Sequence, residues 1–380
     1  MTTKADTSVK WFHSGMADAP VLNGLAGSMI ELLDACLING FSTRNPDSVV
    51  VAGGVATVSI SAGNPYDKHA VIAISGASEA ALNAEWRIDT SAASSFTFLC
   101  PGVADGTVTG AVLKRAGAGW GKPFADTNVA VYQSLDPSST QLYLQVIDTH
   151  GRAANIVGYE QMTDAVTGAG RFPTTSQSSS GLSWAKSSTA DAVARTWAIF
   201  SDEKIFYLYL ATYGIYPGVG GFGDIESFVD MDRYNCVVAG ANSHPNLGYP
   251  SSSMRFCAAG SSGAYMARHS DQVTVSGTPA ARSAVGSSAF GTVGYGGPAG
   301  GQNVLRGSVC VNDTNGSSGS PLRGILPGVI EPLHHAFSGV RNVASFDGSG
   351  AFSGRQIVGL EYAGDNIYGS IAFDVTGPWR

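Results

Sequence analysis

The sequence predicts an all-β protein, mainly an antiparallel sandwich or barrel, with one N-terminal helix and long Gly/Ser-rich loops. Three observations predict it. Apolar residues alternate with a period of two over many short segments, as they do in half-buried strands. Turn-forming residues separate these segments, and glycine alone accounts for 49 of the 380 residues. Helical spacing over several turns occurs near the start of the chain, where it predicts a single helix.

The predicted helix lies within residues 23–40, NGLAGSMIELLDACLING. Asn23 is the expected N-cap, because a short amide side chain can accept from the first free N–H groups of a helix. Gly40 lies where the helix should end in the left-handed conformation. The apolar positions that recur at helical spacing are Leu25, Met29, Leu32, Leu33 and Cys36.

Short strands follow the helix, and together they form the predicted first domain, residues 1–125. VVVAGGVATVSI (49–60) is expected to form two strands hinged at Gly53-Gly54. Further strands, separated by Gly, Asn, Pro and Asp, are expected at 69–75, 85–89, 95–100 and 106–114. Such close spacing indicates a small sandwich or barrel. The Gly-rich segment 115–124 is the expected end of this domain.

The predicted second domain, residues 126–380, is a less regular β domain rich in loops. Two apolar runs around Ser201-Asp202-Glu203-Lys204 predict a hairpin with a polar tip. Long loops rich in Gly, Ser and Pro are expected at 163–190 and 259–303. Structureless loops of this length usually bind something or pack against a neighbouring chain.

Composition excludes several classes of function. The net charge of −7 and the pI near 5.4 argue against nucleic-acid binding, which needs a basic surface. No apolar stretch reaches the ~20 residues of a bilayer span, so no membrane insertion is expected. The start of the chain lacks the apolar region of a signal peptide, and the five scattered cysteines are expected to be reduced and mostly buried. We therefore expect a protein made in a cytoplasm.

The segment GSSGSP (316–321) has the spacing of the loop that presents the nucleophile of chymotrypsin-like proteases, with Ser318 as the candidate. That chemistry also needs a histidine base and an orienting acid. His69 precedes a predicted strand instead of following one, and His334 and His335 come after Ser318, the wrong order for that fold. We therefore predict no catalytic residue and no enzyme, with a serine hydrolase using Ser318 as an alternative.

Other clusters do not predict a ligand. His334 and His335 are neighbours, so their side chains would leave opposite faces of a strand. GVGGFGD (218–224) has glycines typical of a phosphate loop but no following lysine and no strand–helix context. Four carboxylates in a short segment lack the EF-hand spacing, and a solvated acidic loop is expected there: Asp224, Glu226, Asp230 and Asp232. We predict no metal site and no cofactor.

The first part of the chain resembles an N-terminal module of tailed-bacteriophage virion proteins, a family of largely uncharacterised structural components. The module runs P-V-L-x-G-x-A-G, a helix, a Gly-rich hairpin, L-N-x-x-W-x-V and S-F-T-F. Patches near 159–174, 196–210, 323–335 and 373–380 are also similar, and 240–310 is least so. The matching residues are Pro20, Val21, Leu22, Gly24, Ala26, Gly27, Leu82, Asn83, Trp86, Phe96 and Phe98.

The resemblance implies a virion structural protein of the phage tail, in the baseplate, tail tip or neck. It would assemble as a symmetric homo-oligomer, with copies of itself and other tail or neck proteins as partners. Residues 1–125 would dock to the particle. The alternatives are a capsid decoration or head-fibre protein, and a receptor or carbohydrate-binding module using tyrosines in the loops at 213–218, 246–250 and 293–297. Candidate interface residues are Trp11, Trp120 and Trp379.

Overall fold

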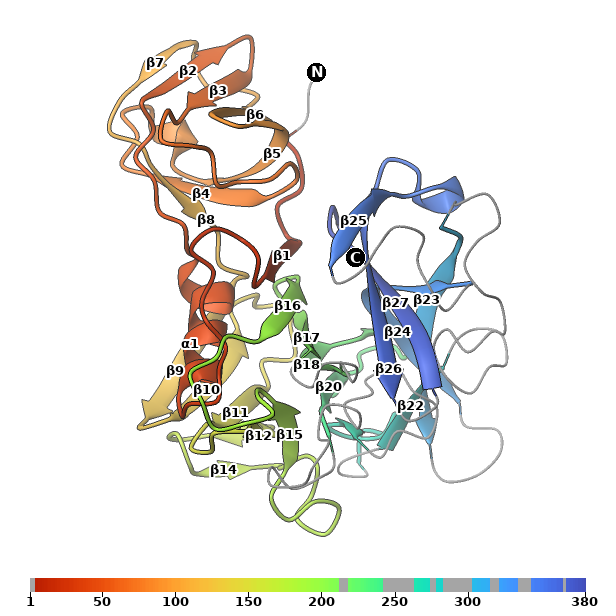
Figure 1. Ribbon diagram of the computed structural model, residues 1–380. Coiled ribbons are helices and arrows are strands. Elements are labelled where there is room, and N and C mark those ends of the chain that lie inside the picture. Colours follow the sequence, from red (N-terminus) through yellow and green to blue (C-terminus); the bar gives the residue numbers. More distant parts are fainter. Residues whose placement is uncertain are drawn as a thin grey trace.

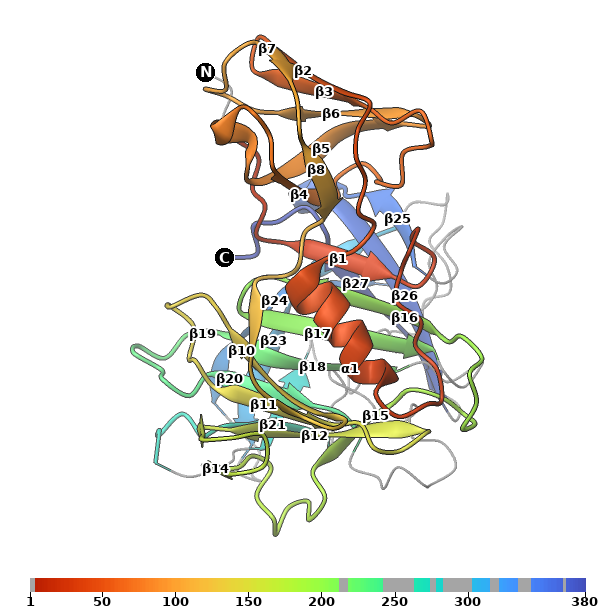
Figure 2. The ribbon, with the colours of Figure 1, turned by 90° about the vertical axis from the view of Figure 1, so that its left-hand side faces the viewer.

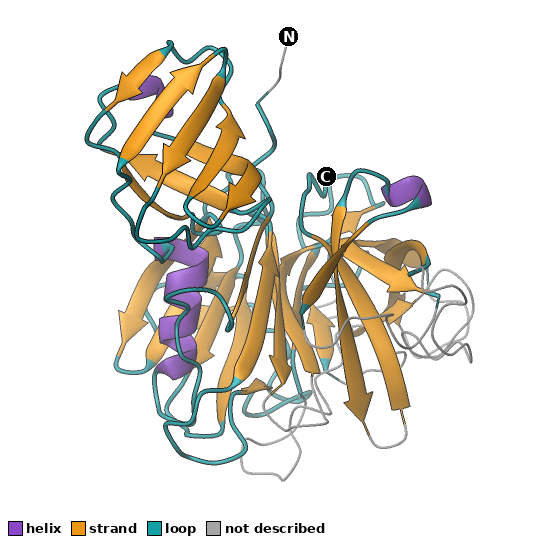
Figure 3. Ribbon diagram, turned by 45° about the horizontal axis from the view of Figure 1, so that its top comes forward, coloured by secondary structure: helices purple, strands orange, loops and turns teal. Residues whose placement is uncertain are grey.

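The computed structural model describes residues 4–211, 218–241, 263–273, 278–282, 303–314, 321–333, 343–364 and 367–380. These residues form four large sheets and one two-stranded ribbon, β13 (Gln161–Met162) with β14 (Gly168–Ala169). The strand pairs within the described ranges are antiparallel, and the predicted all-β class is confirmed (Figure 1 and Figure 3).

A small barrel-like unit stands at one end of the molecule (Figure 1). Its seven strands follow the order β7-β2-β3-β6-β5-β4-β8 and curl around one apolar core that contains Trp86, Phe96 and Phe98. The hinge predicted at Gly53-Gly54 is confirmed, because both residues have positive φ and join β2 to β3. The strands are β2 (Ser48–Ala52), β3 (Val55–Ser59), β4 (Val71–Ser75), β5 (Glu85–Ala92), β6 (Ser95–Leu99), β7 (Gly106–Val108) and β8 (Val112–Arg115).

A six-stranded sheet lies at the centre of the rest of the molecule, and both of its faces are buried. In its strand β17, Phe206 and Leu208 face one apolar core, whereas Tyr207 and Tyr209 face another. The predicted hairpin is confirmed as β16 and β17. In sheet order the strands are β1 (Lys10–His13), β16 (Thr196–Ser201), β17 (Ile205–Ala211), β18 (Gly218–Asp224), β20 (Cys236–Ala239) and β21 (Ala264–Met266).

Two further sheets cover the faces of the central sheet, which makes a three-layered stack. The N-terminal cover is β15 (Leu182–Ala185), β12 (Ala153–Tyr159), β11 (Tyr143–Ile147), β10 (Val129–Ser134) and β9 (Trp120–Asp126). The C-terminal cover is β22 (Thr278–Arg282), β23 (Leu305–Thr314), β24 (Leu322–Pro332), β27 (Ile367–Asp374), β26 (Gln356–Gly364) and β25 (Ala344–Asp347), with β19 (Glu226–Ser227) paired to β24. Strand β9 begins inside the segment expected to close the first domain.

The helix begins later than predicted. It comprises α1 (Ser28–Leu33) and a π-helical continuation, Asp34–Asn39, and its N-cap is Gly27 with φ 88°. The Asn23 side chain accepts from the Leu25 N–H at 2.9 Å instead, in a local turn. The predicted end is at the right place, since Gly40 caps the helix with a positive φ of 69°.

The helix packs in the core between the central sheet and the N-terminal cover, not in the barrel-like unit (Figure 2). The apolar face that includes Met29, Leu32 and Leu33 lies there with Trp120 and Phe206. The structure therefore divides the chain differently from the predicted domains 1–125 and 126–380. The barrel-like unit, about residues 44–116, is inserted between the helix and the sheets that the helix covers.

A buried ion pair fixes the start of α1. The Asp148 carboxylate accepts from the Met29 N–H at 2.8 Å, which is the role that an N-cap side chain would have. Lys186 pairs with the same carboxylate and donates to the Leu25 carbonyl, and both charged side chains are fully buried. Burial raises the pKa of Asp148 above its ordinary 3.8, although Lys186 opposes the shift.

Replacing Lys186 with Met should destabilise the protein by about 3 to 5 kcal/mol, because it leaves the Asp148 carboxylate buried without its partner. Urea denaturation followed by circular dichroism measures the free energy of unfolding. The matched control is D18N, which breaks the exposed ion pair with Arg44 (2.7 Å) and should cost less than about 1 kcal/mol. Equal losses in the two variants would contradict the role given to the buried pair.

Candidate functional site

Several motifs of the sequence lie outside the described residues. These are Ser318 with its loop, the adjacent His334 and His335, and Cys257. The tyrosine-bearing loop segments 213–217, 246–250 and 293–297 also lie outside them. Within the described residues, Cys36, Cys100 and Cys236 are buried thiols and Cys310 is half-buried. Burial raises the pKa of the Cys36 and Cys236 thiols well above their ordinary value, which makes both unreactive at neutral pH.

The prediction that residues 224–232 form a solvated acidic loop is wrong for two of the four carboxylates. Asp224 is buried and accepts from the backbone N–H and the hydroxyl of Thr140, at 2.7 and 2.6 Å. Asp232 forms a buried ion pair with Arg323, 3.0 Å from its Nε. Glu226 and Asp230 are exposed as expected. No group of three His, Cys, Asp or Glu side chains in the described part of the chain is placed to hold a metal ion.

The glycines of GVGGFGD form the central strand β18 and not a phosphate loop. At Gly220 a Cβ would lie 2.4 Å from the indole nitrogen of Trp184, which donates to the Ala239 carbonyl at 2.8 Å. The glycine therefore makes room for a tryptophan between two sheets.

The three tryptophans proposed as interface residues have different surroundings. Trp120 is 2% exposed and packs edge-on against Phe206, so it is a core residue and is not available at the surface. Trp379 is half-buried and lies over Gly328, where a Cβ would be 2.0 Å from its ring. Trp11 is half-buried and lines a cleft. Neither Trp120 nor Trp379 lines this cleft, so Trp11 is the one of the three that belongs to it.

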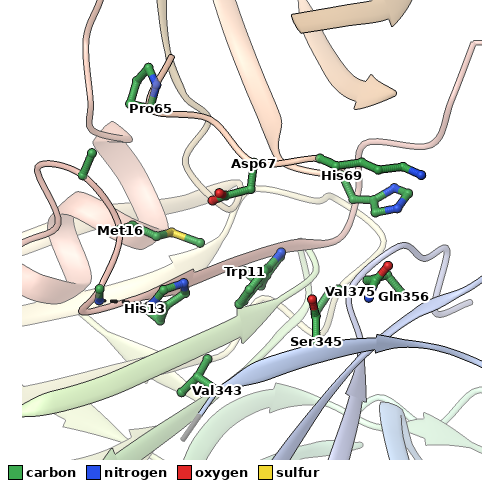
Figure 4. A pocket seen from close by; sticks show the side chains of 13 residues that line it. Trp11, His13, Met16, Pro65, Asp67, His69, Val343, Ser345, Gln356 and Val375 are labelled. Carbon is green, nitrogen blue, oxygen red and sulfur yellow. Dashed lines mark hydrogen bonds between the residues drawn. The ribbon is translucent and has the colours of Figure 1, made fainter. Parts of the chain in front are cut away.

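The cleft lies where three parts of the chain meet and has a volume of about 380 Å³. Figure 4 shows Trp11 and His13 on the same side of β1, as the period of two in a strand requires. The loop 65–69 of the barrel-like unit forms a second wall, and the C-terminal cover contributes the third. The residues of the third wall are Val343, Ser345, Gln356 and Val375.

Arg87 of β5 joins these three walls. Its buried guanidinium donates to the carbonyls of Val9 at 2.9 Å, His69 at 2.8 Å and Val375 at 3.1 Å. It also donates to the Asp6 carbonyl at 2.6 Å. The four acceptors come from the segment before β1, from the loop 65–69 and from the chain after β27, so one side chain sets the distances between the walls.

A second arginine fixes the loop 65–69. Arg115 is 2% exposed and donates to the Pro65 carbonyl at 2.6 Å and to the Asp67 carboxylate at 3.0 Å. Asp67 itself is exposed towards the cleft, with 62% of its side-chain surface accessible. His69 holds a positive φ of 66°, which few non-glycine residues adopt. The wall is therefore a rigid loop.

Burial favours the neutral form of both histidines of the cleft. Burial lowers the pKa of His13 below its ordinary 6.5, with Asp67 opposing the shift and Arg115 adding to it. Burial also lowers the pKa of His69, helped by Lys68 and Arg87 and opposed by Asp89 and Asp347.

The Nδ1 of His13 accepts from the Gly15 N–H at 3.1 Å, so the ring proton of the neutral form lies on Nε2. The cleft thus offers donors and acceptors beside an aromatic surface.

The sequence singled out Trp11 as an interface candidate, and it did not predict the cleft or the other residues that line it. The alternation in KWFH could have placed His13 beside Trp11, because residues two apart in a strand share a face. Asp67, His69 and Gln356 carry no such signal, since long-range pairing brings them to β1.

Comparisons with known proteins give no family for this chain. No protein-family model matches the sequence, and no curated protein matches it. No helix in the described ranges is long and apolar enough to cross a membrane.

The lowered pKa values of His13 and His69 should make the protein less stable as the pH falls. The unfolded chain, whose histidines have the ordinary pKa of 6.5, binds more protons than the folded protein below about pH 7. The free energy of unfolding should therefore decrease between pH 7.5 and 5.5, and less steeply in H13Q. Urea denaturation at several pH values tests this, with H150Q at an exposed turn as the control. A steeper slope in H13Q would overturn it.

Replacing Arg87 with Leu should cost about 2 to 4 kcal/mol, because several carbonyls lose a charged donor. Hydrogen exchange should also accelerate in residues 9–13 and around 375. The control is R171L, which removes donors to Pro173 and Ser178 in the arginine's own loop. If exchange in R87L changed only inside the barrel-like unit, the proposed joining of three walls would be wrong.

Proposed function

We propose that this chain is a structural protein of a bacteriophage tail, a component of the baseplate, tail tip or neck that assembles as a symmetric homo-oligomer. One observation carries the proposal: most of the residues that resemble the phage virion module, apart from the exposed Val21 and Ala26, are residues on which the fold of the first 120 positions depends. A resemblance confined to exposed positions would carry no such weight.

The first group of matching residues sets the approach to the helix. Leu22 is fully buried in the core that holds α1. Gly24 passes so close to residues 189–191 that a Cβ would lie 2.0 Å from the Thr189 carbonyl oxygen. Gly27 supplies the positive φ of the N-cap. These positions require the residue types that they share with the module.

The second group builds the barrel-like unit. The Asn83 amide accepts from the N–H of Ala77 and donates to its carbonyl, at 2.8 and 3.0 Å, which closes the loop before β5. Trp86 donates to the Leu82 carbonyl at 2.9 Å and stacks on Phe98, with ring centroids 5.3 Å apart. The match therefore supports a shared module and not a chance similarity of composition.

The arrangement of the parts also supports a structural role. The barrel-like unit stands at one end of a larger three-layered body, as an attachment module would (Figure 2). In the proposed particle this unit docks to a neighbouring virion protein, and the layered body makes the contacts between copies.

The proposal is tested on purified phage particles from the source of this sequence. Immunogold electron microscopy with an antibody against the chain should place gold at the tail tip, baseplate or neck, and mass spectrometry should find the chain in the particles. Gold over the head would support a decoration or head-fibre protein instead. Absence from the particles, together with a monomeric recombinant protein, would contradict the proposal.

A further inference from the structure

The cleft beside Trp11 is organised before any ligand arrives. Arg87 ties its three walls together through carbonyls of Val9, His69 and Val375, and Arg115 holds the loop that carries Asp67. Neither arginine belongs to the lining; both fix the positions of the segments that do. Rigid walls lower the entropy that binding would cost. The volume of about 380 Å³ falls in the range of roughly 300 to 1,000 Å³ usual for small-molecule sites.

An aromatic surface forms one side of the cleft. The ring of Trp11 lies almost parallel to that of Phe200 on the neighbouring strand, at 3° with centroids 6.3 Å apart. The His13 ring stacks on Trp11 from two residues further along β1, with centroids 5.2 Å apart. Trp11 is therefore held in one orientation although it is only half-buried, and its indole remains part of the cleft lining.

The other sides present hydrogen-bonding groups of both kinds. His13 offers an Nε2–H donor, and the Asp67 carboxylate offers acceptors while Arg115 holds it. The hydroxyl of Ser345 and the amide of Gln356 each carry donor and acceptor atoms. Such a mixture suits vicinal hydroxyl groups, each of which donates one hydrogen bond and accepts others.

The lining of the cleft carries no net formal charge. Asp67 and Lys68 are the formally charged residues of its lining, with opposite signs, and burial favours the neutral form of the two histidines. Arg115 already pairs with the Asp67 carboxylate, and Lys68 is exposed to solvent, which screens its charge. The balance favours a neutral, polyhydroxylated ligand with one apolar face.

We propose that this cleft binds a neutral saccharide of one or two rings, with a C–H face of the sugar on Trp11 and its hydroxyl groups on Asp67, Gln356 and His13. The ligand could be part of a cell-surface glycan or a free sugar, and the same chemistry serves both. The proposal rests on the geometry of the cleft and stands whether or not the chain is a tail protein.

The test uses the full-length protein and saturation-transfer NMR. The probes are the methyl glycosides of glucose, galactose, mannose, rhamnose and N-acetylglucosamine, and their common disaccharides. At least one neutral sugar should bind with a dissociation constant below about 10 mM, which isothermal titration measures. W11A and Q356A should each weaken that binding at least tenfold, and W11F only a few-fold because an aromatic face remains.

Two features keep the outcome decisive. Gln356 is a half-buried residue of the lining, so Q356A tests the site even if W11A unfolds. Circular dichroism of each variant checks the fold. The control is L135A, at an exposed residue that is not part of the lining, which should bind like the wild type. The proposal fails if no sugar of the panel binds, or if binding survives Q356A unchanged.

Discussion

The burial of both faces of the central six-stranded sheet is the constraint on which the rest of the structure depends. Each strand must supply apolar side chains to two cores at once, and β17 does so with phenylalanine and leucine towards the helix and tyrosines towards the C-terminal cover. The Tyr207 hydroxyl also donates to the Pro327 carbonyl at 2.9 Å. A hydrogen bond therefore joins the central sheet to the C-terminal cover in addition to the apolar packing between them. The cover layers, the helix and the edge strand β1 are all placed by this sheet.

Local pattern predicted much of the fold. Strands and hairpins such as β2–β3 and β16–β17 follow from alternation and from paired turn residues, which are properties of neighbouring positions. The domain division did not follow, because the helix belongs with strands made long after the barrel-like unit. The predicted start of α1 is wrong for a related reason: the side chain that accepts from its Met29 N–H belongs to Asp148, 119 positions away in the chain.

Long-range contacts also explain why most of the cleft could not be predicted from the sequence. Its organiser, Arg87, bonds to backbone carbonyls, and any residue type provides those, so no sequence pattern marks the acceptors. Trp11 and His13 are adjacent on one strand face and were within reach of pattern analysis. The acidic segment was misjudged because Thr140 and Arg323, the partners of its buried carboxylates, lie far away in the chain.

The pairing of β1 with β16 also sets an order of events during synthesis. At about 5 to 20 residues per second, the ribosome needs on the order of 10 to 40 s after making Lys10 to reach its partner Ser201. The barrel-like unit is complete well before then, and its Arg87 and Glu85 already offer bonds to Val9 and Lys10. The contacts of β1 with the barrel-like unit therefore join residues made early in synthesis, whereas its pairing with β16 has to wait for a much later part of the chain.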